Sequence, residues 1–294
     1  MSSRQVDFAR ITVRVREREL AERISAEAHA AGASGLEERD EEGVICLLVY
    51  APVALAQRVA DAVALPGAQV TGVEQEAPVD WSESWKRQLG PIEISPALRV
   101  RPSFTPAPLA AGQRELLIDP GQAFGTGAHE STRLALEWVA ALAPRLDAGT
   151  RVLDVGTGSG VLALAALRMS GTRAVALDLD PLAGAAARDN AEVNGLVDRF
   201  ACFTGPLAAL RGGERFELVV ANLLASELRP ILDALMERVA PAGRLVVSGL
   251  LVSECAPLLA RGETAGLQFA GERRREDGSG VAWASLCMVR SARP

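Results

Sequence analysis

Residues 151–160 have the sequence Arg-Val-Leu-Asp-Val-Gly-Thr-Gly-Ser-Gly. The apolar residues at the start of this segment are typical of a buried strand, and the Ala- and Leu-rich segment Val161–Met169 that follows is typical of a helix. Glycines between a strand and a helix predict a tight turn in which a ligand can lie directly against main-chain N–H groups. We therefore predict a cofactor-binding turn, with Gly156 and Gly158 among its binding residues.

The turn does not match the dinucleotide fingerprint G-x-G-x-x-G, because the third glycine of that pattern would stand where this chain has Val161. Asp178 lies near the end of a second expected strand, 22 positions after Gly156. At that spacing a carboxylate can accept hydrogen bonds from both hydroxyls of an adenosine ribose. In the alternative interpretation, the glycines only close the turn and Asp178 caps a helix that begins at Pro181.

The composition indicates a globular chain with one large domain or two ordinary ones. The chain has 294 residues, of which 49% are hydrophobic, enough to form substantial cores. No apolar run reaches the length of a membrane span, and residues 1–10 lack the apolar core of a signal peptide. We therefore expect a cytoplasmic protein that does not contact the membrane.

The net charge limits the classes of partner, and the cysteine and histidine content limits the possible metal sites. The formal net charge is −6 and the pI is about 5.2, which argues against direct nucleic-acid binding and is compatible with a basic protein as partner. The four cysteines are scattered without a C-x-x-C pair, and the chain has two histidines. We therefore predict buried thiols and no metal site.

Residues 1–76 show a βαββαβ pattern, which predicts a ferredoxin-like domain with an antiparallel sheet and two helices. Its expected elements are a strand over Val6–Arg16, a helix over Glu17–Ala31, strands over Gly35–Arg39 and Val44–Tyr50, a helix from Pro52 to about Leu65, and a strand over Gln69–Glu74. We find no catalytic constellation in this segment. We interpret the domain as a substrate-recognition module, with a purely structural appendage as the alternative.

Residues 77–91 form the expected junction between the domains. Trp81 and Trp85 are at helical spacing, which predicts a linker helix that packs on one of the domains rather than a clamp on the substrate. Short strands are expected over Ile92–Arg101 and Glu115–Asp119, around a proline-rich loop. They lead into a second domain over residues 92–294.

Glycines, hydroxyls and His129 are concentrated in residues 119–132, just before an amphipathic helix. N–H groups and polar side chains therefore gather at a helix N-terminus, where a polar or anionic ligand group can bind. The alternative is an ordinary loop in which Ser131 or Thr132 caps the helix.

The remainder of the second domain predicts a doubly wound α/β fold that ends in an antiparallel hairpin, an arrangement typical of class I methyltransferases. The further strands are expected over Arg199–Phe203, Phe216–Asn222, Arg244–Leu250, Gln268–Glu276 and Val281–Val289, with helices near Ser226–Val239 and Glu254–Arg261. The charged run Glu272–Asp277 is interpreted as a solvated turn. Asn222 ends its strand on the side where open α/β sheets bind ligands, and its side-chain oxygen can accept a hydrogen bond from a substrate amine or a cofactor amino group.

Four motifs resemble the ribosomal protein L-eleven (L11) methyltransferase family. They are Phe-Gly-Thr-Gly-x-His-x-x-Thr at 124–132, Asp-x-Gly-x-Gly-Ser-Gly at 154–160, Asp-x-Asp-Pro at 178–181 and Ala-Asn-hydrophobic-Leu-Ala at 221–225. The resemblance covers essentially the whole chain, including the small N-terminal domain. Ser131 stands where many members have threonine, which keeps the hydroxyl.

The resemblance implies S-adenosylmethionine as cofactor, with Thr132, Gly156, Asp178 and Asn222 at the positions of the family's cofactor contacts. It also implies methylation of lysine side chains and of the N-terminal amine of ribosomal protein L11. Because the sulfonium is already activated, the enzyme must mainly hold a neutral amine in line with the methyl group. Asn222 is the residue that we expect to orient the amine. We expect a monomer that acts on this basic protein.

Other functions remain open at this point. A lysine methyltransferase for a different protein would keep every cofactor motif, and a catalytically silent binding protein of the same fold would show a damaged cofactor turn. An RNA methyltransferase is disfavoured by the acidic pI. Methyltransferases that act on planar amino groups often have Asn-Pro-Pro-Tyr where this chain has Asn-Leu-Leu-Ala at 222–225, and the missing aromatic weakens the case for a flipped nucleobase.

Overall fold

The computed structural model describes residues 8–41, 44–75, 90–119 and 127–292. The chain divides into two compact units, Met1–Gln88 and Leu89–Pro294, and each is described by itself. The predicted linker helix over residues 77–91 lies almost wholly outside the described residues. The predicted domain limits at residues 76 and 92 therefore stay predictions.

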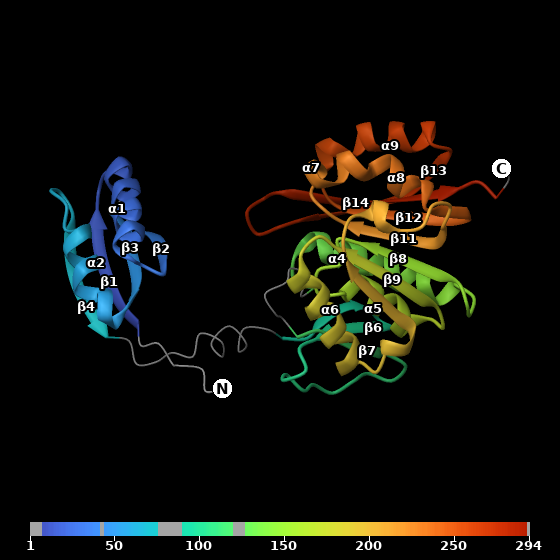
Figure 1. Ribbon diagram of the computed structural model, residues 1–294, viewed down its shortest axis with the longest axis horizontal. Coiled ribbons are helices and arrows are strands. Elements are labelled where there is room, and N and C mark those ends of the chain that lie inside the picture. Colours follow the sequence, from blue (N-terminus) through green and yellow to red (C-terminus); the bar gives the residue numbers. More distant parts are fainter. Residues whose placement is uncertain (1–7, 42–43, 76–89, 120–126, 293–294) are drawn as a thin grey trace. The chain divides into compact units, whose positions relative to one another are not determined.

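The first unit is a four-stranded antiparallel sheet with α1 and α2 packed on one face (Figure 1). Its elements are β1 (Phe8–Val15), α1 (Arg18–Ala31), β2 (Gly35–Glu41), β3 (Val44–Pro52), α2 (Ala56–Val63) and β4 (Gln69–Gln75). The strand order β2-β3-β1-β4 confirms the predicted ferredoxin-like arrangement. Alternate residues of the central strands, such as Ile11 and Val13 on β1, are fully buried against the helices.

The second unit contains a seven-stranded sheet in the order β10-β9-β8-β11-β12-β14-β13. The first five strands in this order are parallel, and β14 and β13 pair antiparallel. The elements are β8 (Arg151–Val155), α5 (Val161–Met169), β9 (Arg173–Asp178), α6 (Pro181–Val193), β10 (Phe200–Thr204), β11 (Phe216–Asn222), α7 (Ala225–Leu228), α8 (Leu232–Glu237), β12 (Val239–Leu251), α9 (Cys255–Thr264), β13 (Leu267–Glu276) and β14 (Ala282–Arg290). The predicted doubly wound sheet with a C-terminal hairpin is confirmed.

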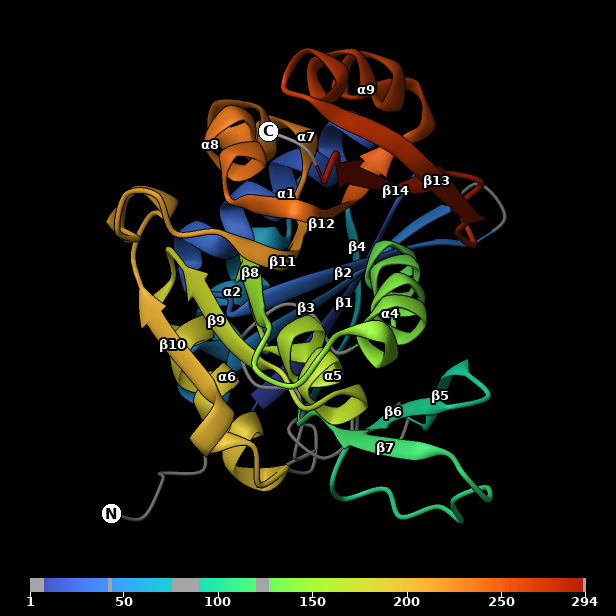
Figure 2. The same cartoon turned by 90° about the vertical axis from the view of Figure 1, so that its right-hand side faces the viewer.

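Both faces of this sheet are buried, and Figures 1 and 2 show the helices on its two sides. On one face, α4 (Glu130–Leu142), α5 and α6 form a core with Val152 of β8. On the other face, α8 and α9 form a second core with Leu153. Successive residues of a strand point to opposite faces, and β8 is apolar except for the exposed Arg151 at its start and Asp154. The sheet order reverses between β8 and β11, and ligands of open α/β sheets bind at the carboxyl ends of the strands beside such a point.

A small three-stranded sheet precedes α4 and differs in part from the prediction. It contains β5 (Ile92–Ser95), β6 (Leu98–Arg101) and β7 (Arg114–Leu117). The single strand expected over residues 92–101 is wrong, because a turn at Pro96 and Ala97 divides it into an antiparallel pair. A proline cannot donate to a strand ladder, which explains the break.

Two other expectations are corrected in the second unit. The helix expected near residues 226–239 is divided into α7 and α8, with Pro230 between them, because proline lacks the N–H that would continue the first helix. The charged run 272–277 is not a solvated turn, since most of it belongs to β13. Arg273 and Arg275 of this run form ion pairs with Glu137 of α4, at 3.0 and 2.7 Å.

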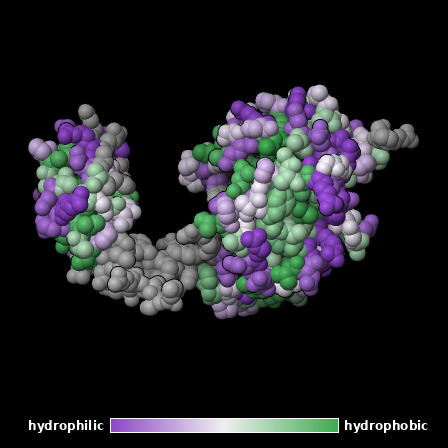
Figure 3. All heavy atoms as spheres, viewed as in Figure 1, coloured by the Kyte–Doolittle hydropathy of each residue, from purple (hydrophilic) through white to green (hydrophobic). Residues whose placement is uncertain are grey.

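The visible surface contains both hydrophilic and hydrophobic side chains. On the face of each unit seen in Figure 3, hydrophilic residues (purple) are interspersed with hydrophobic ones (green). No helix in the described part of the chain is long and apolar enough to span a membrane. The topology of the seven-stranded sheet indicates the carboxyl end of its parallel strands as the place for a ligand site.

Candidate functional site

The glycine turn between β8 and α5 is held against the neighbouring strand β9. Gly156 and Gly158 have φ values of 71° and 53°, in the left-handed region that favours glycine. The N–H groups of Gly156 and Thr157 both donate to the carbonyl of Leu177, with N···O distances of 2.9 and 3.0 Å. A Cβ atom at Gly156 would overlap the side chain of Leu223, so only glycine fits the turn as it stands.

Asp178 ends β9 and faces the same turn. Its Oδ2 accepts a hydrogen bond from the N–H of Gly158 at 2.9 Å, and its Oδ1 accepts one from the N–H of Asp180 at 3.0 Å. The alternative in which Asp178 caps α6 is wrong, because Asp180 is the N-cap and accepts from the N–H of Leu182 at 2.9 Å. Each oxygen of Asp178 has a second acceptor direction left for a ligand hydroxyl.

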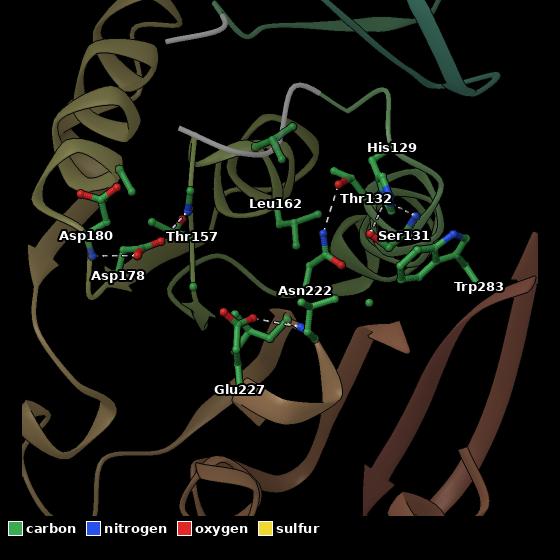
Figure 4. A pocket seen from close by; sticks show the side chains of 17 residues that line it. His129, Ser131, Thr132, Thr157, Leu162, Asp178, Asp180, Asn222, Glu227 and Trp283 are labelled. Atoms are coloured by element: carbon green, nitrogen blue, oxygen red, sulfur yellow. Dashed lines mark hydrogen bonds between the residues drawn. The ribbon is translucent and has the colours of Figure 1, made fainter. Parts of the chain in front are cut away.

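Asn222 ends β11 and lies between the two sides of the site in Figure 4. Its Nδ2 donates to Oγ1 of Thr132 at 3.1 Å, which fixes the orientation of the amide. Its Oδ1 is buried and has no hydrogen-bond partner among the described residues. A buried acceptor without a partner carries a desolvation cost of about 1 to 3 kcal/mol, which a ligand N–H donor at this atom would relieve.

The first turn of α4 supplies Thr132. His129 is the N-cap of this helix, since its Nδ1 accepts from the N–H of Ser131 at 3.2 Å and lies 2.8 Å from Oγ of Ser131. The interpretation in which Ser131 or Thr132 is the cap is therefore wrong. Ser248 of β12 donates its hydroxyl to the carbonyl of Ser131 at 2.7 Å. This bond joins the start of α4 to the central sheet, beside Asn222.

These residues line a cavity of about 550 Å³. The structure brings all the predicted binding residues to it: Thr132, Gly156, Gly158, Asp178 and Asn222. Asp180 and Glu227 also line it, whereas the described lining residues include no lysine or arginine. A cleft lined by charges of one sign concentrates ligands of the opposite sign, so the cavity is suited to a cationic ligand.

Trp283 and Glu227 line the cavity but were not selected from the sequence. The ring of Trp283 on β14 meets that of His129 edge to face, with centroids 4.8 Å apart, and its Nε1 donates to Asp277 at 2.9 Å. Hydrogen bonds from Ser279 and then from Trp283 hold the pKa of Asp277 well below its usual range. Trp283 could not have been found, because only the position of β14 beside β12 brings it to the site. The sequence did contain a signal for Glu227, because it closely follows Asn222, which was expected at the ligand-binding end of its strand.

Asp154 lies on β8 beneath the glycine turn and is fully buried. Its Oδ2 accepts from Oγ1 of Thr157 at 2.8 Å and from the N–H of Ala163 at 3.1 Å, so it caps α5, whose N-cap Gly160 has no side chain. Its Oδ1 has no partner among the described residues. Burial raises the pKa of Asp154 to about 6, against the opposing effect of the two hydrogen bonds.

The family model described as "Ribosomal protein L11 methyltransferase (PrmA)" matches residues 37–290. The ribosomal protein L11 methyltransferase of Pelobacter propionicus is 37% identical over 231 residues, covering 78% of this chain and 72% of that protein. The one of Syntrophotalea carbinolica is 37% identical over 251 residues, covering 82% and 78%.

A solved structure is also similar. The crystal structure of ribosomal protein L11 methylase from Lactobacillus delbrueckii subsp. bulgaricus superposes with a TM-score of 0.59 at 28% sequence identity. The match covers 68% of this chain and 98% of that one. These similarities confirm the resemblance that the sequence motifs predicted.

We predict that Asp154→Asn removes one component of the pH dependence of stability. The folded-state pKa of about 6 is above the ordinary value of 3.8, so between these values the folded protein binds more protons than the unfolded chain. The contribution of Asp154 to stability is therefore greatest at low pH and is lost as the pH rises through about 6. Asparagine keeps an acceptor for Thr157 and Ala163 and does not ionise.

Urea unfolding of both proteins from about pH 4 to pH 7 measures this effect. The variant should gain roughly 2 to 3 kcal/mol relative to the unsubstituted protein across that range. Stability curves that stay parallel would show that Asp154 does not titrate with a raised pKa.

Proposed function

The chain belongs to the ribosomal protein L11 methyltransferase family, and from this premise we propose that it transfers methyl groups from S-adenosylmethionine to amino groups of ribosomal protein L11. The acceptors are lysine side chains and the N-terminal amine. One observation carries the proposal for this chain: the buried Oδ1 of Asn222 has no partner among the described residues and lines a cavity suited to cations.

The residues of the cavity fit the cofactor. Asp178 would hold the ribose hydroxyls, for which its carboxylate has free acceptor directions. Gly156 and Gly158 would let the ligand approach the main chain, since neither places a Cβ between the turn and the cavity. When bound, S-adenosylmethionine supplies a methyl group that its positively charged sulfonium has already activated. The acidic lining of the cavity matches that charge.

The role of Asn222 in this reaction is to orient the acceptor amine. The hydrogen bond from Nδ2 to Thr132 leaves Oδ1 as the atom that can accept an amine N–H. An amine held through one N–H has its lone pair directed away from that bond, and such positioning can supply much of a methyl-transfer rate enhancement. Asn222 and Thr132 thus act as a pair.

The setting of the reaction follows from the proposed substrate. A ribosomal protein as acceptor favours a cytoplasmic enzyme, and basic ribosomal proteins suit a chain with a net charge of −6. We further propose that the enzyme acts as a monomer, that it does not contact nucleic acid directly, and that residues 1–76 recognise the substrate while residues 92–294 carry the cofactor.

Mass spectrometry tests the proposed function directly. Purified ribosomal protein L11, incubated with the full-length protein and S-adenosylmethionine, should gain mass in whole methyl increments, and peptide fragmentation should place them on amino groups. An unmodified L11 in the presence of enzyme that binds the cofactor would indicate a different protein substrate. A protein that does not bind S-adenosylmethionine would indicate a catalytically silent member of the fold.

We predict that Asp178→Ala weakens cofactor binding. Hydrogen bonds to a charged group are worth about 1.5 to 3 kcal/mol, so the dissociation constant for S-adenosylmethionine should rise roughly 10- to 150-fold. Isothermal titration calorimetry measures it. Asp178→Asn keeps one acceptor oxygen, so its dissociation constant should lie between those of the unsubstituted protein and Asp178→Ala. An unchanged dissociation constant in folded Asp178→Ala would remove Asp178 from the cofactor site.

We predict that a shortened chain beginning at Trp81 keeps cofactor binding but loses most methylation of L11. The five proposed binding residues all lie in the second unit, Leu89–Pro294, which has its own core. Loss of a docking domain removes binding energy that positions the acceptor, so kcat/KM for L11 should fall far more than cofactor affinity. Steady-state kinetics and calorimetry compare the two chains. If the shortened chain is folded and equally efficient, residues 1–76 are not the recognition module.

A further inference from the structure

Glu227 is an exposed acidic residue that lines the cavity just after Asn222 in the sequence. It lies on α7, which follows directly after Asn222, Leu223 and Leu224, and it lines the cavity with these residues. Figure 4 shows Asp178 and Asp180 on one side of Asn222, His129 and Trp283 on the other, and Glu227 below Asn222 in this view. If Asp178 holds the ribose of the cofactor, Glu227 is the carboxylate left to interact with the amine that receives the methyl group.

The carboxylates of the cavity differ in what they bind. Both oxygens of Asp178 accept backbone N–H groups, and Asp180 caps α6. Glu227 accepts the N–H of Leu224 through Oε2 at 3.1 Å, and no ion pair within the described residues involves it. Since the described lining contains no lysine or arginine, the charge of Glu227 is left without a cationic partner.

A glutamate or a glutamine can make the backbone contact of Glu227, so this contact does not require the charge. Glutamine accepts the same hydrogen bond in this type of cap. Glu254 makes the same type of capping bond elsewhere in the chain, since its Oε2 accepts the N–H of Leu251 at 2.9 Å. Glu254 lies outside the cavity and faces Arg229 at 3.8 Å. Glu227 therefore differs from it in facing a ligand cavity instead of a cation.

We propose that Glu227 captures the protonated amine of the acceptor at the mouth of the cavity, before Asn222 orients it for transfer; this rests on the proposed function. Amino groups of lysine are ammonium ions at neutral pH, and an exposed carboxylate attracts them. A carboxylate also stabilises the charged form of the amine. Glu227 is thus a specificity-determining residue that selects cationic acceptors, and not the group that removes the proton.

The test uses Glu227→Gln, with Glu254→Gln as the matched control. Both variants keep a capping acceptor and lose one charge, but only the first loses it at the cavity. In steady-state methylation of L11, Glu227→Gln should raise KM roughly 2- to 5-fold, as expected for an exposed ion pair, and should make KM less dependent on NaCl concentration. Glu227→Lys, which reverses the charge, should raise KM about tenfold or more. The dissociation constant for S-adenosylmethionine should change less than the KM for L11 in Glu227→Gln.

A binding measurement separates this inference from the proposed function. Titration with n-butylammonium chloride, followed by NMR of the backbone amides of residues 222–227, should show saturable shifts that n-butanol does not reproduce. Glu227→Gln should weaken the saturation at least threefold, and Glu254→Gln should leave it unchanged.

If the unsubstituted protein methylates L11 and Glu227→Gln matches Glu254→Gln in both measurements, the capture role is wrong and the proposed function stands. If the ammonium probe binds through Glu227 but L11 is not methylated, the proposed function is wrong and the cation site stands.

Discussion

The hydrogen bonds that fasten the glycine turn to β9 are the constraint on which the site depends. Gly156 and Thr157 donate to the carbonyl of Leu177, and Gly158 donates to the carboxylate of Asp178. The turn, the start of α5 and the end of β9 therefore form one rigid unit, supported from below by the buried carboxylate of Asp154. Because β11 pairs with β8 on the side away from β9, this unit faces Asn222 across the cavity.

The polar groups around the cavity suit a reaction in which the donor is already activated. His129 is engaged as the cap of α4, and Asn222 is held by Thr132 with its oxygen left for a ligand. Hydroxyls, an amide and carboxylates can bind and orient a cationic cofactor and an amine, and positioning is the main requirement of such a transfer. The acidic lining suits the cavity to cationic ligands.

The C-terminal hairpin holds α4 from outside the parallel strands. Glu137 of α4 pairs with Arg273 and Arg275 of β13, and the guanidinium of Arg273 lies 4.5 Å from the ring centroid of Trp138. On β14, Trp283 packs against His129 at the start of the same helix. The antiparallel end of the sheet therefore fixes the helix that carries Thr132, and a charged run that looks like a solvated turn in the sequence is an ion-pair contact.

The sequence by itself determined the elements with strong local patterns. Period-two alternation revealed the ferredoxin-like strands, the glycines at 156, 158 and 160 marked the turn after β8, and the position of Asp178 and Asn222 at strand ends placed both at one edge of the sheet. Tertiary structure decided what depends on contacts between distant residues. The cap of α4 at His129 and the arrival of Trp283 at the cavity follow from packing and from the place of β14 in the sheet. So does the unpartnered oxygen of Asn222, because a side chain's hydrogen bonds are set by its neighbours in space, and local sequence carries no record of them.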